Sequence, residues 1–303
     1  MLTSIEKQAL QSYRQDRGDD INRGMKIDRD AWLEFGIRIL LDAGRTLRES
    51  RFSPLLDTVS YKQDGSPSLG VEKEIEEKLR QRLAKFAPDA GVLGEETGGT
   101  LSGDGVILVI DPVDGTWSLL NRSETHSTSL AFFEDGRVFL GMVSNPVTGE
   151  IAYALADQPT RLIQLSLFGE PDDSFDLPID RADSSKLLVN AHPARESGSL
   201  VAELFKGWVQ GEVQMVKAPG GSPAWALLEA AKGTFTYVNT WPGKPADPFD
   251  LAAAVSLVRG AGGDVLGADG KPIVASGHQG PFVAGINKNH RLALVQILES
   301  IRR

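Results

Sequence analysis

The sequence predicts an α+β protein in which an antiparallel sheet is followed by an alternating α/β region. Strand-forming side chains dominate residues 128–133, 137–144 and 150–155, and turn signals separate the three runs. These connections are too short for a crossover helix, so the strands are expected to be antiparallel. From about residue 186, strand-like and helical patterns alternate, which favours a mixed or parallel second sheet.

Helical periodicity predicts two helices in the first third of the chain. The first begins near Asp28 or Asp30, either of which is a suitable cap, and extends to about residue 49. The second covers about residues 71–86, with apolar side chains at four-residue spacing that are typical of core packing. The polar residues 1–27 are expected to form a peripheral extension.

The second half of the chain contains further predicted elements. Strands are expected at residues 187–190, 213–216 and 235–239, and helices at residues 197–208, 223–232 and 289–302. Asp247-Pro248 opens one more helix, because Asp favours the cap and Pro the first helical position. Residues 172–185 are acidic and polar and are interpreted as a connection. We therefore predict an N-terminal extension (1–27), an α+β subdomain (28–180) and an α/β subdomain (181–303).

The composition limits the possible partners. The chain has 303 residues, a formal net charge of −9 and no cysteine. No block of Lys and Arg is long enough to form a nucleic-acid-binding stripe, so DNA and RNA polymers are not expected partners. The absence of cysteine excludes disulfides and zinc–thiolate sites. Neither a signal peptide nor a membrane-length apolar run is present, so we expect a cytoplasmic protein without a membrane partner.

The most informative stretch is Asp111-Pro112-Val113-Asp114-Gly115-Thr116, which follows the apolar run at residues 106–110. That run predicts a buried strand that ends where the two aspartates begin. Carboxylates this close repel each other unless a cation neutralises them, and an all-oxygen ligand set suits Mg²⁺. Gly115 would let the backbone approach a phosphate. An ordinary turn is the alternative interpretation.

Two more acidic stretches accompany this motif in a characteristic order. Gly94-Glu95-Glu96 follows the apolar residues 91–93, and Asp247-Pro248-Phe249-Asp250 leads into a helical run that ends near Gly262-Gly263. Together the three stretches resemble the inositol monophosphatase family of Mg²⁺-dependent, lithium-sensitive phosphomonoesterases, from about Trp32 to the C-terminus. The resemblance implies the layered α/β/α/β/α sandwich of the sugar-phosphatase type, an active site between its two halves, and a homodimer.

The resemblance also implies which residues hold metal. Glu95, Asp111 and the carbonyl of Val113 would bind one Mg²⁺. Asp111, Asp114 and Asp250 would bind a second, and a third, weaker ion would lie near Glu95. Bound ions would neutralise the phosphoryl oxygens and activate the attacking water. Asp250 has an alternative role, since an acidic residue in the first turn also stabilises a helix.

A pair of residues is implied in orienting the water. Thr116 would act with Glu95, and Glu72 would accept a hydrogen bond from Thr116, although the family usually has Asp in place of this Glu. The alternatives are that Thr116 caps a short helix ending near residue 120 and that Glu72 is an exposed acid at a helix N-terminus. Glu96 is expected to be a solvated neighbour.

The substrate side shows more departures from the family pattern. Gly115 and Thr116 would face the phosphate, and Ser222 would contact the leaving group. Lys62 stands where relatives often carry a basic residue, although an exposed lysine fits equally well. The stretch 237–246 lacks the Glu that grips inositol hydroxyls in the family. A rebuilt pocket wall would use residues of this stretch, although a surface loop suits each of them as well; the candidates are Asn239, Trp241 and Lys244.

The sequence thus predicts Mg²⁺-dependent hydrolysis of a small phosphorylated metabolite by direct attack of water. Inositol phosphate, fructose 1,6-bisphosphate, a 3′(2′),5′-bisphosphate nucleotide and histidinol phosphate all remain open as substrates. A non-catalytic metal- or sugar-phosphate-binding protein is the less favoured alternative. Only the replacement of the usual Asp by Glu72 supports it, since all the implied metal ligands are present.

Overall fold

The computed structural model describes most of the chain from Asp28 onward. The described residues are 28–50, 59–62, 65–101, 105–166, 171–179, 187–192, 198–217, 221–240, 245–246 and 248–301. The predicted extension over residues 1–27, and the predictions that concern Trp241, Lys244 and Asp247, lie outside them.

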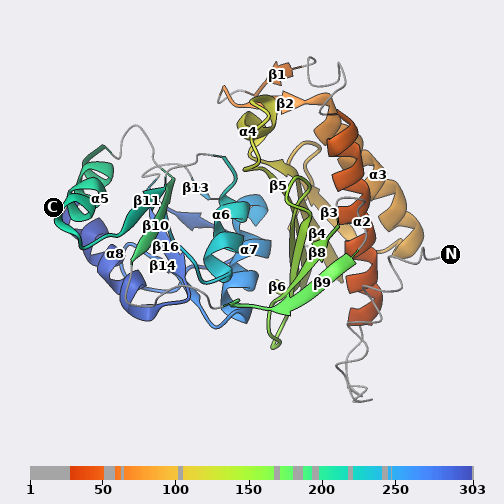
Figure 1. Cartoon of the computed structure of the whole chain (residues 1–303). Helices are drawn as coiled ribbons and strands as arrows, with labels where there is room; N and C mark the ends of the chain where they lie inside the picture. The colour runs from red at the N-terminus through yellow and green to blue at the C-terminus, as the bar shows by residue number, and fades with distance from the viewer. Residues whose placement is uncertain are drawn as a thin grey trace.

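Two helices form the first layer. They are α2 (Arg29–Ser50) and α3 (Gly70–Phe86), which confirms both predicted helices. Asp28 caps the first, because its Oδ1 accepts a hydrogen bond from the Ala31 amide at 3.1 Å. Both helices pack their apolar faces against a sheet (Figure 1).

A seven-stranded sheet forms the second layer. Its strands lie in chain order, and only the first pair is parallel: β3 (Gly91–Gly94), β4 (Val106–Asp114), β5 (Ser127–Glu134), β6 (Arg137–Asn145), β7 (Glu150–Leu155), β8 (Arg161–Leu165) and β9 (Pro171–Asp176). The three antiparallel strands expected from the sequence are confirmed. The interpretation of residues 172–185 as a connection is wrong for their first part, because β9 pairs with β8 there.

Two small elements cover one end of this sheet. A hairpin of β1 (Val59–Tyr61) and β2 (Pro67–Leu69) precedes α3, and the short helix α4 (Thr116–Leu120) follows β4. The hairpin forms because Gly65, with φ +82°, supplies the turn between two extended segments.

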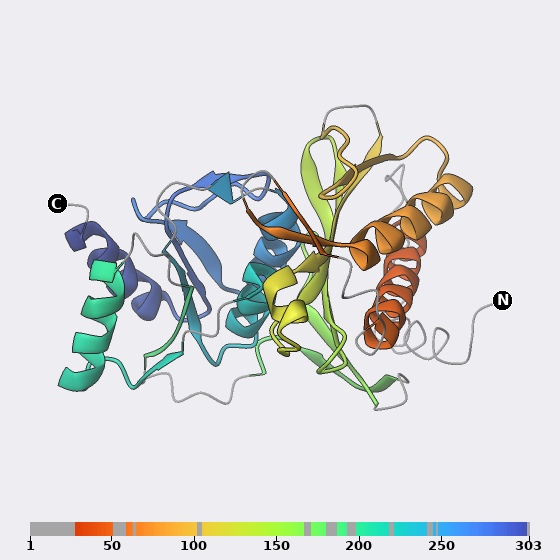
Figure 2. The ribbon, with the colours of Figure 1, turned by 90° about the horizontal axis from the view of Figure 1, so that it is seen from above.

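A central pair of helices separates the two sheets, as Figure 2 shows from above. These helices are α6 (Pro223–Ala231) and α7 (Pro248–Gly260), and their small side chains are buried on all sides. The close approach is visible at Gly141 of β6, where a Cβ atom would lie 2.7 Å from the Ala253 carbonyl oxygen. Small residues on α7 therefore let it lie directly on the first sheet.

The second sheet has five strands in the order β11 (Met215–Lys217), β10 (Leu188–His192), β12 (Thr236–Asn239), β16 (Phe282–Gly285) and β14 (Asp264–Gly267). Its first three strands are parallel and the last two pair antiparallel, so the mixed sheet predicted from the sequence is confirmed. A separate two-stranded ladder joins β13 (Pro245–Ala246) to β15 (His278–Gln279).

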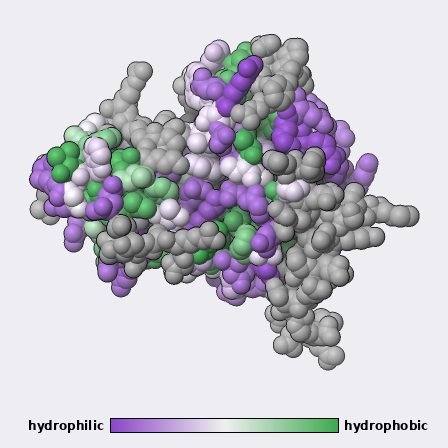
Figure 3. Space-filling view, viewed as in Figure 1, coloured by the Kyte–Doolittle hydropathy of each residue, from purple (hydrophilic) through white to green (hydrophobic). Residues whose placement is uncertain are grey.

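The outer layer consists of α5 (Gly198–Gln210) and α8 (Lys288–Ile301), which completes the predicted α/β/α/β/α order. Exposed apolar side chains on α5, at the left of Figure 3, are Phe205, Trp208 and Val209. No helix among the described residues is long and apolar enough to cross a membrane.

Candidate active site

The first two acidic side chains lie on β4 itself. The prediction that the strand ends before Asp111 is wrong, because β4 continues to Asp114. Side chains three residues apart on a regular strand point to opposite faces. The pairing with β5 is irregular between Asp111 and Asp114, a stretch that includes Pro112, which has no amide hydrogen to donate to the ladder. This irregularity allows both carboxylates to reach one side.

Asp250 joins them from the first turn of α7. The three residues each offer a carboxylate oxygen, and these oxygens lie within 4.8 Å of one another. Asp111 and Asp114 are buried. Burial raises the pKa of Asp111 well above its usual value, and the charges of Glu95, Asp114 and Asp250 raise it further. We call Asp111, Asp114 and Asp250 the acidic cluster.

Asp114 is oriented by the start of α6. Its Oδ2 accepts hydrogen bonds from the Ser222 hydroxyl at 2.5 Å and from the Ala224 amide at 2.6 Å. Ser222 is buried and caps α6, since its hydroxyl oxygen accepts from the Trp225 amide at 2.8 Å. The described contacts of Ser222 thus fix Asp114, and its contact with a leaving group stays a prediction.

Glu72 reaches Thr116 despite the extra methylene. The Thr116 hydroxyl donates to Glu72 Oε1 at 2.7 Å, and the Leu69 amide donates to Glu72 Oε2 at 2.7 Å. Glu72 is buried, so the alternative of an exposed helix-terminal acid is wrong. Burial raises the pKa of Glu72 to about 7, although both hydrogen bonds oppose this shift.

Gly115 connects the acidic cluster to Thr116. It has φ +91°, and a Cβ atom there would lie 3.0 Å from both the Ser222 amide nitrogen and the Thr125 carbonyl oxygen. Only glycine suits this position, which brings Thr116 at the start of α4 beside the cluster.

Glu95 approaches the acidic cluster from the loop after β3. Its amide donates to the Ile110 carbonyl at 3.2 Å, and its charge adds to burial in raising the pKa of Asp111. Lys62 forms ion pairs with Glu95 at 2.7 Å and with Glu96 at 2.6 Å. Burial lowers the pKa of Lys62, but these hydrogen bonds outweigh it and raise the pKa above its usual value.

Glu96 differs from its prediction. Its side chain is only 4% exposed. Besides the ion pair with Lys62, its Oε2 accepts a hydrogen bond from the Ser68 hydroxyl at 2.6 Å. The expectation of a solvated Glu96 is wrong because the β1–β2 hairpin, which carries Lys62 and Ser68, covers it.

Sequence reasoning missed two residues close to the site. Glu76 is buried beneath the Glu95–Glu96 turn, and its position one helical turn after Glu72, on the apolar face of α3, was the available signal. Tyr237 is buried as well. Burial raises its pKa well above the usual value, and the charges of Asp114 and Asp250 raise it further.

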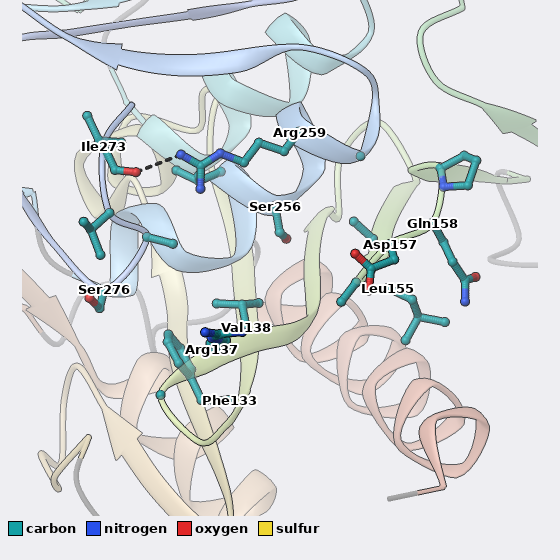
Figure 4. Close-up of a pocket in the computed structure, with 18 of the residues that line it drawn as sticks. Phe133, Arg137, Val138, Leu155, Asp157, Gln158, Ser256, Arg259, Ile273 and Ser276 are labelled. Carbon is teal, nitrogen blue, oxygen red and sulfur yellow. Dashed lines mark hydrogen bonds between the residues drawn. The ribbon is translucent and has the colours of Figure 1, made fainter. Parts of the chain in front are cut away.

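A hollow of about 720 Å³ lies at the other end of α7 (Figure 4). It is lined by the β5–β6 turn, the β7–β8 turn, the end of α7 and residues 273–276. Arg259 crosses its wall and donates to the Ile273 carbonyl at 2.8 Å. The hollow contains none of the predicted site residues, so it is separate from the acidic cluster at the start of the same helix.

Comparison with known proteins agrees with this geometry. The chain matches the inositol monophosphatase family over residues 28–302 and belongs to that family. It is 28% identical over 256 residues to a histidinol-phosphatase of Mycobacterium tuberculosis, covering 81% of this chain and 90% of the relative. It is 24% identical over 242 residues to an inositol-1-monophosphatase of Bacillus subtilis, covering 79% and 86%.

Solved structures confirm the fold. An IMPase of Thermotoga maritima superimposes with a TM-score of 0.73 at 23% identity, covering 91% of this chain and 98% of that one. The family resemblance and the layered sandwich predicted from the sequence are therefore confirmed. The chain is a phosphoric monoester hydrolase of a metal-dependent family that acts on small phosphorylated substrates.

Proposed function

We propose that the chain hydrolyses a small alcohol phosphate with Mg²⁺ as cofactor. The observation that carries this proposal is the acidic cluster, in which three carboxylates offer oxygens within 4.8 Å of one another. The residues fit a hard divalent cation because the donor set is all oxygen. A cation would also offset the burial and the neighbouring charges that together raise the pKa of Asp111.

The family resemblance implies the proposed ligands, and the acidic cluster supplies three of them. Glu95, Asp111 and the Val113 carbonyl would hold one ion, and Asp111, Asp114 and Asp250 a second, with a third near Glu95. When bound, Mg²⁺ supplies charge neutralisation of the phosphoryl group and lowers the pKa of a water. Two to three ions per chain and inhibition by lithium are expected on the strength of the family resemblance.

The protein residues would orient the attacking water. The Thr116 hydroxyl donates a hydrogen bond to Glu72. Its oxygen lone pairs therefore remain available to accept a hydrogen bond from a water. Glu95 would accept the water's other hydrogen, so the oxygen would face phosphorus. Gly115 and Thr116 are the proposed phosphate contacts and Ser222 the proposed leaving-group contact. A homodimer and a cytoplasmic location are further proposals.

Histidinol phosphate is the substrate we propose to test first. Relatives named histidinol-phosphatase share 28% identity in M. tuberculosis and 29% in Streptomyces coelicolor. The stretch 237–246 also lacks the Glu expected for gripping inositol, and Asn239, at the end of β12, is the candidate wall residue within the described part.

Release of inorganic phosphate tests the proposal. The panel is histidinol phosphate, inositol 1-phosphate, fructose 1,6-bisphosphate and 3′-phosphoadenosine 5′-phosphate, each with Mg²⁺, with EDTA, and with added lithium. We expect turnover of one substrate that EDTA abolishes and lithium lowers. Tight binding of Mg²⁺ by calorimetry with no turnover of the panel would favour the non-catalytic binding protein instead.

A further inference from the structure

A second carboxylate on α3 lies beneath the turn that carries Glu95. Glu76 is fully buried and follows Glu72 by one helical turn. Its Oε2 accepts a hydrogen bond from the Glu96 amide at 3.1 Å, and its Oε1 accepts one from the Thr97 hydroxyl. Glu72 and Glu76 therefore connect one helix to two separate parts of the candidate site, the start of α4 and the turn that carries Glu95.

Arg80, on the next turn of α3, contacts both Glu76 and the turn that carries Glu95. Its Nη2 forms an ion pair with Glu76 Oε1 at 3.2 Å and also donates to the Gly98 carbonyl at 2.8 Å. Its Nε donates to the Thr97 hydroxyl oxygen at 2.9 Å. The pair Glu76–Arg80 thus binds the turn through both donors and acceptors, and charge makes these hydrogen bonds stronger than neutral ones.

The turn at residues 94–98 leaves space for the Glu76 carboxylate. Gly94 and Gly98 exchange backbone hydrogen bonds of 3.0 and 2.8 Å, which close the turn around Glu95. A Cβ atom on Gly94 would lie 1.2 Å from Glu76 Oε1. Glycine at position 94 is therefore a steric requirement of the Glu76 contact.

Glu95 is held through the peptides on both of its sides. Its own amide donates to the carbonyl of Ile110, the neighbour of Asp111, at 3.2 Å. The following amide, that of Glu96, donates to Glu76. With both flanking peptide planes fixed, the direction in which the Glu95 side chain leaves the backbone is set relative to Asp111.

We propose that Glu76, held by Arg80, is a positioning residue that presets Glu95 for metal binding. This inference rests on the proposed function, in which Glu95 is a metal ligand. Glu76 itself does not reach the acidic cluster; it acts through the Glu95–Glu96 peptide. Outer partners that orient metal ligands typically change metal affinity by about 10- to 100-fold when they are altered.

The test compares three variants of the full chain. Glu76→Gln keeps the shape and one acceptor, but its amide group faces donors of Thr97 and Arg80. Arg80→Met removes the ion pair with Glu76 and the hydrogen bond to the Gly98 carbonyl at a partly exposed position. It tests the same role if Glu76→Gln fails to fold. Glu77→Gln, at an exposed neighbouring position, is the matched control. The measurements are the Kd for Mn²⁺ alone by calorimetry, the Mg²⁺ concentration for half-maximal phosphate release, and Tm.

We expect Glu76→Gln to raise the Mn²⁺ Kd and the half-saturating Mg²⁺ concentration by about tenfold. Arg80→Met should shift both in the same direction by less, Glu77→Gln should shift neither, and excess Mg²⁺ should restore much of the lost rate. A lower Tm with unchanged Kd and unchanged Mg²⁺ dependence would overturn the positioning role. If the wild type binds Mn²⁺ but hydrolyses nothing, the proposed function fails, and the Kd comparison still decides this inference.

Discussion

Two groups of carboxylates differ in how the surrounding residues stabilise their negative charge. In the acidic cluster, three carboxylates converge and the pKa of Asp111 is raised by its neighbours as well as by burial. On α3, Glu72 and Glu76 are set one helical turn apart, and each carboxylate oxygen accepts at least one hydrogen bond.

The difference indicates two kinds of task. A group of acids that repel one another is stabilised by binding a cation, whereas a carboxylate whose oxygens already accept hydrogen bonds holds other parts of the protein in place. The acidic cluster is thus suited to bind a cation, whereas Glu72 and Glu76 on α3 are suited to hold neighbouring segments of the site in place. Three substitutions test this comparison.

The largest effect is expected for Asp111→Asn. Removing this charge should lower the rate of phosphate release by about a hundredfold or more, because the site would lose electrostatic stabilisation of the transition state. Tm of the EDTA-treated protein should stay equal or rise, since the substitution relieves repulsion. Asp157→Asn, an exposed change in the hollow at the far end of α7, is the matched control. Near-normal turnover in a folded Asp111→Asn protein would refute the binding role of the cluster.

An intermediate effect is expected for Gly94→Ala. Because the new methyl group would occupy the position of the Glu76 carboxylate, Glu76 must withdraw and the turn must shift. Overpacking of this kind costs about 1–3 kcal/mol, measurable by urea unfolding. Gly70→Ala, where a Cβ would meet no atom within 4 Å, should change little. Equal stability and metal affinity in Gly94→Ala would show that the Glu76 contact is dispensable.

The smallest effect on rate, about tenfold, is expected for Glu72→Gln. The single carbonyl oxygen of the glutamine can accept the hydrogen bond from the Leu69 amide or from the Thr116 hydroxyl, but not both. Phosphate release at saturating Mg²⁺ measures this loss. Glu77→Gln again provides the exposed control.

Glu72→Gln also makes a prediction about pH. The pKa of Glu72 rises from its ordinary value of 4.5 to about 7 on folding. Between these values the folded protein binds more protons than the unfolded chain, so stability falls as pH increases through this window. In EDTA, the free energy of unfolding should therefore fall less steeply between pH 4.5 and 7 in Glu72→Gln than in the wild type. Identical slopes would contradict a protonated Glu72.

Local patterns gave most of the fold. The helices α2, α3, α6, α7 and α8 and the antiparallel strands β5–β7 were predictable because periodicity and turn signals are properties of neighbouring residues. The strands β8 and β9 were missed, and in β9 the polar residues 172–174 resemble a loop. They form a strand because β8 offers an edge for pairing.

The sequence by itself determined the acidic motifs, their order and hence the family, because these features can be read from neighbouring residues and their spacing along the chain. Only the tertiary structure decided that Asp111 and Asp114 share one side through an irregular strand, that Glu96 is covered and that Glu76 supports Glu95. The physical reason is that these facts depend on hydrogen bonds and sterics between segments distant in the chain, which no local pattern records.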